Sequence, residues 1–266
     1  MRVAALLPLL ASILLPGVGR AAEPRSLAVA VAANLKPAFE EIAARFQATH
    51  PGVEVRATYG ASGIFFAQIA NGAPFDLFLS ADAEFPARVF AQGLADGKAF
   101  TYAIGKLVVW VPKDSRVDLQ GKGLQALAEP SIERIAIANP EVAPYGRAAR
   151  TALERAGLLP ALQPRIVTGQ SVAQAAQFAE SGSAQAAFLP LSLTLVPPLS
   201  AAGRTWAVPA TAHEPIEQAG VVLRGARQPA LARELAAFLV GESAREVLAR
   251  HGYDLPLRPS PVPPAR

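Results

Sequence analysis

The 266-residue chain contains no cysteine. This absence excludes disulfide bonds, thiolate metal sites and cysteine nucleophiles, as well as the lipid-bearing cysteine that tethers many exported bacterial proteins. The sequence also has no Gly-Xaa-Ser-Xaa-Gly elbow and no cluster of histidines or paired carboxylates. The groups that usually carry covalent or acid–base catalysis are therefore missing, and no enzyme activity is assigned.

Metal-binding and phosphate-binding patterns are missing too. His50, His213 and His251 have no partner at metal-ligand spacing, so surface or helix-capping roles are expected for them and no metal site is. Gly121-Lys122-Gly123 lacks the further glycine of a dinucleotide loop and the Lys-Ser/Thr pair of a P-loop, which favours a turn over a nucleotide site. The basic residues are scattered, so no nucleic-acid partner is expected.

The first 21 residues have the pattern of a secretory signal. Arg2 supplies a positive start, residues 3–15 form an apolar run, and Gly19-Arg20-Ala21 offers a cleavage site before Ala22. The run is shorter than the roughly 20 residues that cross a bilayer, which favours cleavage over a membrane anchor. Loss of Arg2 and Arg20 would lower the formal net charge from +4 to +2.

From Ser26 onwards, short apolar runs rich in β-formers alternate with helical patterns, which indicates an α/β fold with largely parallel sheets. The spacing of Leu35, Phe39, Ile42 and Phe46 predicts one buried helix face. Strands are expected at 27–31, 53–59, 76–79, 103–111, 135–138, 165–167, 186–189 and 221–223. Helices are expected at 35–46, 64–70, 82–92, 146–156, 172–180 and within 231–251.

The repeat of this pattern predicts two Rossmann-like lobes with a ligand cleft between them and a hinge where the chain crosses twice. Lobe 1 is expected to be discontinuous, with lobe 2 inserted into it, and the proline-rich end is expected to be a disordered tail. The predicted boundaries are 22–105 with 211–256 for lobe 1, 106–210 for lobe 2, and 257–266 for the tail.

Four predicted strand-to-helix junctions carry small or polar residues, the position where open α/β sheets bind ligands. They are Ala33-Asn34, Ala61-Ser62-Gly63, Pro144-Tyr145-Gly146 and Gln170-Ser171-Val172. Helix starts leave N–H groups unpaired and carry partial positive charge, so several that converge form an anion site without lysine or arginine. Asn34, Ser62 and Tyr145 can add side-chain donors. The alternative is that Asn34, Ser62 and Ser171 are ordinary helix caps.

A site built only from donors favours an oxyanion that carries no proton. Phosphate keeps an O–H near neutral pH and this group needs an acceptor, whereas molybdate, tungstate and sulfate are fully deprotonated. The hydrogen bonds to a charged ligand are worth roughly 1.5 to 3 kcal/mol each, and desolvation of the dianion offsets much of that sum. The sequence therefore predicts a receptor for a tetrahedral oxyanion, with sulfate left open beside molybdate and tungstate.

The chain resembles the periplasmic molybdate-binding proteins of ABC transporters, which have the type II periplasmic-binding-protein fold. The segments that carry the resemblance are Val31-Ala32-Ala33-Asn34-Leu35, Tyr59-Gly60-Ala61-Ser62-Gly63, 71–82, 100–110 and 137–146. The resemblance implies a monomer in the periplasm that binds molybdate or tungstate, has no other cofactor, and docks on a membrane permease. It implies that Asn34 with Ala33, Ser62, Tyr145 and Val172 hold the anion.

Two departures from the family pattern concern the donor set. Many members have serine where Asn34 stands, and many use a tyrosine from the strand that here reads Ala187-Phe188-Leu189-Pro190. Asn34 and Tyr145 are similar to those of a subgroup with rearranged donors. Asp76 and Asp82 would repel an anion at close range, so loop and capping roles are expected for both.

Functions from another class remain as alternatives. An exported hydrolase on this fold would use Ser62 as a nucleophile and would need a base, but no histidine is expected near it. A sensor module is a second alternative. The export signal and the lack of a helix-turn-helix segment speak against a DNA-binding regulator.

Overall fold

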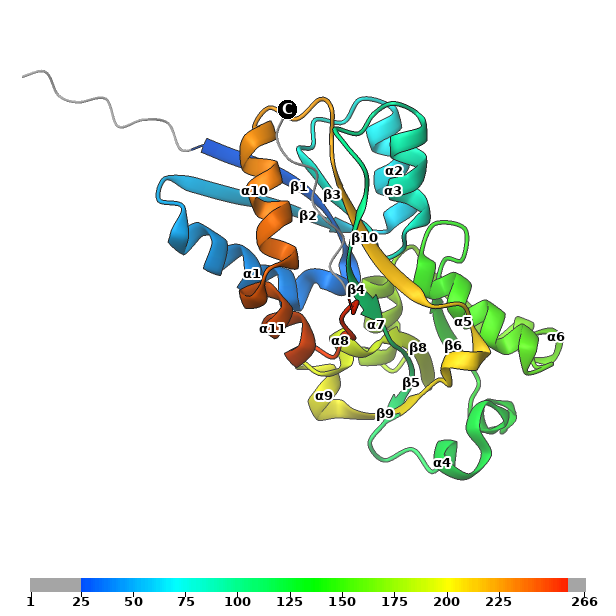
Figure 1. Cartoon of the computed structure of the whole chain (residues 1–266). Helices are drawn as coiled ribbons and strands as arrows, with labels where there is room; N and C mark the ends of the chain where they lie inside the picture. Colours follow the sequence, from blue (N-terminus) through cyan, green and yellow to red (C-terminus); the bar gives the residue numbers. More distant parts are fainter. Residues whose placement is uncertain (1–24, 258–266) are drawn as a thin grey trace, which may run out of the picture.

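The computed structural model describes residues 25–257 (Figure 1). The predicted signal segment and residues 258–266 of the predicted tail lie outside the described residues. No helix among the described residues is long and apolar enough to cross a membrane.

Ten strands form two five-stranded mixed sheets, one in each lobe (Figure 1). The first has the order β2-β1-β3-β10-β4 and contains β1 (Arg25–Ala32), β2 (Val53–Gly60), β3 (Leu77–Leu79), β4 (Phe100–Gly105) and β10 (Ile216–Val222). The second has the order β7-β6-β8-β5-β9 and contains β5 (Leu107–Pro112), β6 (Ile135–Ala138), β7 (Ile166–Gly169), β8 (Ala186–Pro190) and β9 (Gly203–Ala207). The α/β fold class is as predicted.

In each sheet a parallel core is extended by antiparallel strands. Strand β1 pairs in parallel with β2 and β3, whereas β10 is antiparallel to β3 and β4. The second sheet repeats this arrangement, with β6 parallel to β7 and β8, and β5 antiparallel to β8 and β9. The chain changes sheet between β4 and β5 and again between β9 and β10. We place the proposed lobe boundaries, 105/106 and 210/211, at these two crossings.

Helices cover both faces of the first sheet (Figure 1). They are α1 (Lys36–Thr49), α10 (Pro229–Val240) and α11 (Glu242–Arg250) on one face, and α2 (Ser62–Ala70) and α3 (Glu84–Ala91) on the other. Because side chains alternate along a strand, Val29 and Val31 pack into the core under α1, α10 and α11. Ala30 packs into the core on the opposite face, under α2 and α3. The predicted buried face of α1 is confirmed, since Phe39, Ile42 and Phe46 are fully buried.

The second lobe is built in the same way with shorter helices. They are α4 (Leu119–Lys122), α5 (Pro144–Arg155), α6 (Leu159–Leu162), α7 (Val172–Glu180), α8 (Leu191–Thr194) and α9 (Leu199–Ala202). One core lies between α5 and the sheet, and the other lies under α7 and contains Trp110, whose indole N–H donates to Leu199 O at 3.1 Å.

The single strand predicted over 103–111 is wrong. The chain forms two strands there, β4 and β5, which pair in different sheets on either side of Lys106. Most residues of both strands are buried and none is exposed, so the apolar run has no periodicity that marks where the pairing partner changes. Strand β9 was not predicted, and β10 begins at Ile216 and not at residue 221.

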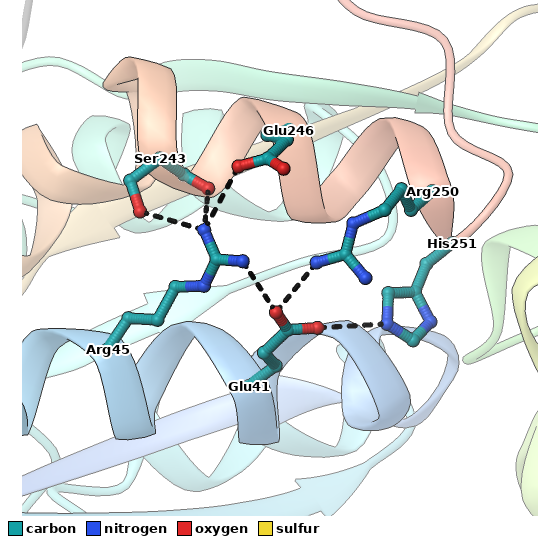
Figure 2. Close-up of polar contacts among 6 residues, drawn as sticks. All are labelled: Glu41, Arg45, Ser243, Glu246, Arg250 and His251. Carbon is teal, nitrogen blue, oxygen red and sulfur yellow. Dashed lines mark hydrogen bonds and ion pairs between the residues drawn. The ribbon is translucent and has the colours of Figure 1, made fainter.

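A charged cluster fastens the C-terminal helix α11 to α1 (Figure 2). The carboxylate of Glu41 accepts hydrogen bonds from Arg45 at 2.8 Å and Arg250 at 2.7 Å, and His251 lies 3.7 Å away. Arg45 also pairs with Glu246 at 3.2 Å. The hydrogen bond from Arg250 is the main reason why the pKa of Glu41 lies below its usual value of 4.5. The cluster fixes the segment after α11, which reaches the interface between the lobes.

Candidate functional site

A small cavity lies between the lobes where the strand-to-helix junctions meet. Its volume is about 10 Å³, close to the roughly 10–15 Å³ that one water molecule needs, so the lining residues lie close together. All five residues predicted for the oxyanion site line it, namely Ala33, Asn34, Ser62, Tyr145 and Val172. The structure thus brings together residues that are up to 139 positions apart in the sequence, and their role as ligands stays a prediction.

No charged residue lines this cavity in the part of the chain that the structure describes. Its electrostatic character comes from helix starts, because α2 and α7 begin at the lining residues Ser62 and Val172, and α5 begins at Pro144. Backbone N–H groups in the first turn of a helix have no intrahelical acceptor and carry the positive end of the helix dipole. This arrangement suits a small anion and not a cation.

Ser62 is buried and takes no part in capping a helix. Its Oγ accepts a hydrogen bond from the backbone N–H of Ala81 at 2.9 Å, so its hydroxyl proton remains available for a ligand. The helix-cap alternative holds for Ser171 alone, whose Oγ accepts from the N–H of Gln174 at 3.4 Å. No histidine or carboxylate forms a hydrogen bond with Ser62 in residues 25–257, so a nucleophile with a general base is not assembled.

Tyr145 is a buried hydroxyl donor positioned by Gln218. The Nε2 of Gln218 donates to the Tyr145 hydroxyl at 3.0 Å, which leaves the hydroxyl proton for another acceptor. Burial raises the pKa of Tyr145 well above its usual value, so the group keeps its proton at all physiological pH values.

We expected the side-chain amide of Asn34 to donate to the ligand, but in the structure it donates to other residues of the protein. Its Nδ2 donates to Gln218 Oε1 and to the Tyr253 hydroxyl, both at 2.9 Å, and its Oδ1 is buried with no partner among residues 25–257. Unpartnered buried amide oxygens are rare, and a half-turn of the amide would place an N–H at the same position. As arranged, both N–H groups of the Asn34 amide are used within the protein.

Sequence reasoning missed the network behind these donors. Gln218 is completely buried in β10 at a shift of register, and it also accepts from the Tyr102 hydroxyl at 3.3 Å. From the second lobe, the Ser192 hydroxyl donates to the backbone O of Asn34 at 2.9 Å. The one available signal was a glutamine close to the apolar run that follows it in β10, because the partners come from separate parts of the chain.

The expected roles of Asp76 and Asp82 are confirmed. Asp76 accepts from the backbone N–H groups of Ala28 at 2.7 Å and Arg227 at 2.6 Å, which ties β1 to the loop before α10. Asp82 Oδ1 accepts from the N–H of Phe85 at 3.1 Å in the first turn of α3.

All three histidines stand at the end of a helix, as expected. His50 and His251 follow α1 and α11, and His213 follows the short 3-10 helix Ala210–Ala212. The surface role is wrong for His213, which is buried with its Nδ1 2.7 Å from Glu214 O. Within the described range there is no group of three or more potential metal ligands.

Comparison with known proteins agrees with the fold. A family model described as bacterial extracellular solute-binding protein matches residues 27–254. Molybdate-binding protein ModA of Azotobacter vinelandii is 39% identical over 236 residues, which cover 88% of this chain and 92% of that protein. ModA of Rhodobacter capsulatus is 38% identical over 241 residues, with 90% and 92% covered. The solved periplasmic molybdate-binding protein of A. vinelandii superposes with a TM-score of 0.80 over 86% of this chain and 99% of that one.

Proposed function

Because the chain belongs to the family of bacterial extracellular solute-binding proteins, a family of binding proteins and not of enzymes, we propose that it captures molybdate or tungstate and delivers it to an ABC importer. Its relatives named for molybdate binding support the choice of ligand. The observation that carries the proposal is the convergence of three helix starts, Ser62 and Tyr145 on one small uncharged cavity.

The energetics of such a site depend on fixed geometry. Each hydrogen bond to the dianion contributes roughly 1.5 to 3 kcal/mol, and the loss of the hydration shell offsets much of the sum. Backbone donors at helix starts lose little conformational entropy when they engage a ligand, which leaves more of the attraction as binding free energy. Selectivity against phosphate follows because its remaining O–H would face donors.

Location and partners form part of the same proposal. The protein would be exported by its first 21 residues, cleaved near Ala22, and released into the periplasm as a monomer without a lipid anchor. Its partner would be the membrane permease of the importer. Mass measurement of the protein purified from the periplasm tests the cleavage, because an intact N-terminus would contradict it.

Isothermal titration of the ligand-stripped protein with molybdate, tungstate, sulfate and phosphate in one buffer tests the ligand. We expect tight one-to-one binding of the first two and weak binding of the others. Tight sulfate binding would instead favour the sulfate receptor, and no heat with any oxyanion would refute the proposal.

A pair of serine variants tests the site. Ser62→Ala removes a hydroxyl from the cavity, and we expect the dissociation constant for molybdate to rise by about tenfold or more. Ser183→Ala is the matched control, because Ser183 is exposed, lies outside the cavity lining, and its hydroxyl bonds to that of Ser181 at 2.8 Å. Equal affinities of the two variants would place the site elsewhere.

A further inference from the structure

The two lobes touch directly beside the anion cavity, where α2 and α3 of the first lobe meet the segment that leads into α5 of the second. The backbone N–H of Gly63 donates to Val142 O at 2.8 Å. A Cβ at position 63 would lie 2.9 Å from Val142 Cα and 2.8 Å from Phe85 Cζ. The contact is therefore close enough to require glycine, and it forms only when the lobes are together.

An ion pair crosses the same interface. Arg147 Nη2 of α5 lies 2.5 Å from Asp82 Oδ2, and Glu84 is 3.5 Å from the same nitrogen. The guanidinium also lies over the Phe85 ring, 5.6 Å from its centroid. Arg147 therefore contacts the first lobe in three ways, through the carboxylates of Asp82 and Glu84 and through the ring of Phe85.

The first lobe holds Asp82 ready for this partner. Its other carboxylate oxygen, Oδ1, accepts from Ser80 Oγ at 2.9 Å and from Phe85 N–H at 3.1 Å. The side chain of Asp82 is only 13% exposed, so little ordering is needed when Arg147 arrives. Exposed ion pairs contribute little, but one with a fixed and shielded carboxylate contributes more.

Asp82 directly follows a residue that lines the anion cavity. Ala81, the preceding residue, lines the cavity and binds Ser62 through its backbone N–H. An uncompensated carboxylate next to the cavity would repel a dianion. Within residues 25–257, Arg147 of the second lobe is the one cation that pairs with this carboxylate, and separation of the lobes would remove it.

We infer that Asp82 and Arg147 form a latch that couples closure of the lobes to retention of the anion. In the closed state the pair holds the lobes together and cancels the charge of Asp82, whereas in the open state the free carboxylate weakens the hold of the first lobe on the ligand. Ligand-driven closure requires this kind of difference in affinity between the two states. The inference rests on the proposed function for the identity of the anion, but not for the interlobe contact itself.

A double-mutant cycle with molybdate as the probe tests the charge coupling. We expect Arg147→Met to raise the dissociation constant by roughly tenfold, mainly through faster dissociation. Asp82→Asn in the Arg147→Met background should restore part of the affinity, because the repelling carboxylate is gone. Arg150→Met is the matched control, since the carboxylates that Arg150 pairs with in the described part of the chain, Glu141 and Glu154, belong to its own lobe. Unchanged affinity of Arg147→Met, or independent effects of the two substitutions, would overturn the latch.

Distances between the lobes provide the second arm. Because the chain has no cysteine, Gln92→Cys and Gln125→Cys would provide the two labelling sites for spin labels. Both positions are exposed, and one lies in each lobe. With saturating molybdate, Arg147→Met should show a broader and longer distance distribution than the parent, and its thermal unfolding without ligand should be nearly unchanged. If the parent binds no molybdate, the proposed function fails, and the latch is then judged on the ligand-free distributions. Identical distributions of parent and variant would refute it in either case.

Discussion

Replacement of Tyr145 by phenylalanine would remove one hydroxyl from the cavity and leave the ring in place. The hydroxyl accepts from Gln218 Nε2 at 3.0 Å and directs its own proton elsewhere. If that proton binds the anion, its loss removes one hydrogen bond to a charged group, worth roughly 1.5 to 3 kcal/mol. The expected rise in the dissociation constant for molybdate is therefore about tenfold to 150-fold.

The same change affects stability through Gln218. Tyr145→Phe leaves a buried N–H of Gln218 without its acceptor, which costs about 1 to 3 kcal/mol. Adding Gln218→Leu removes the stranded donor but also the acceptor of Asn34 Nδ2, so the double variant should regain neither the lost free energy of unfolding nor the affinity. Thermal unfolding without ligand and titration with molybdate separate the two effects. Unchanged affinity of Tyr145→Phe, or recovery of affinity in the double variant, would show that Tyr145 does not bind the anion.

Three further predictions concern residues outside the cavity lining. Gly105→Ala should weaken molybdate binding, measured by titration, because its Cβ would lie 2.0 Å from the Tyr145 hydroxyl oxygen. Asp76→Ala should lower the free energy of unfolding by about 2 to 4 kcal/mol in denaturant titration and leave the affinity unchanged, since Asp76 binds backbone N–H groups far from the cavity. The pKa of Glu41 is depressed, so its contribution is present above its unfolded pKa and lost as the pH falls through the lower folded value. The stability difference between parent and Glu41→Gln, at most about 1 kcal/mol near neutral pH, should therefore shrink below pH 4.5.

The strand-to-helix junctions could be predicted because their signal is local. A strand followed by a small or polar residue and then a helical pattern fixes where a backbone N–H group is left unpaired, whatever the rest of the chain does. Parallel strands place such junctions at one edge of a sheet, and two lobes face their edges toward each other. For this reason the four junctions could be expected to face one cleft, and the resemblance to the molybdate-binding family singled out Asn34, Ser62, Tyr145 and Val172 within them.

The hydrogen bonds behind the junctions could not be predicted, because they depend on register and on the crossing between sheets. Gln218 reaches Asn34 and Tyr145 only because β10 lies beside β3 and β4 with a shift of register at that residue. Neither the pairing nor the shift has a local signal. The same is true at Lys106, where one apolar run of the sequence is divided into two strands that belong to different sheets.

Ser62 and Ser171 show why a local pattern leaves the role of a residue open. Both stand at the start of a helix that points at the cavity, and both were compatible with capping or with ligand binding. Ser171 caps α7 because its oxygen faces the N–H of Gln174. Ser62 is the first residue of α2 and its oxygen is taken by the N–H of Ala81 from another strand end, which turns its proton away from the helix. The tertiary acceptor, and not the residue type, therefore decides which hydroxyl can serve a ligand. Ser171→Ala should accordingly destabilise the protein by about 1 kcal/mol through loss of the cap, with the affinity for molybdate changed far less than in Ser62→Ala.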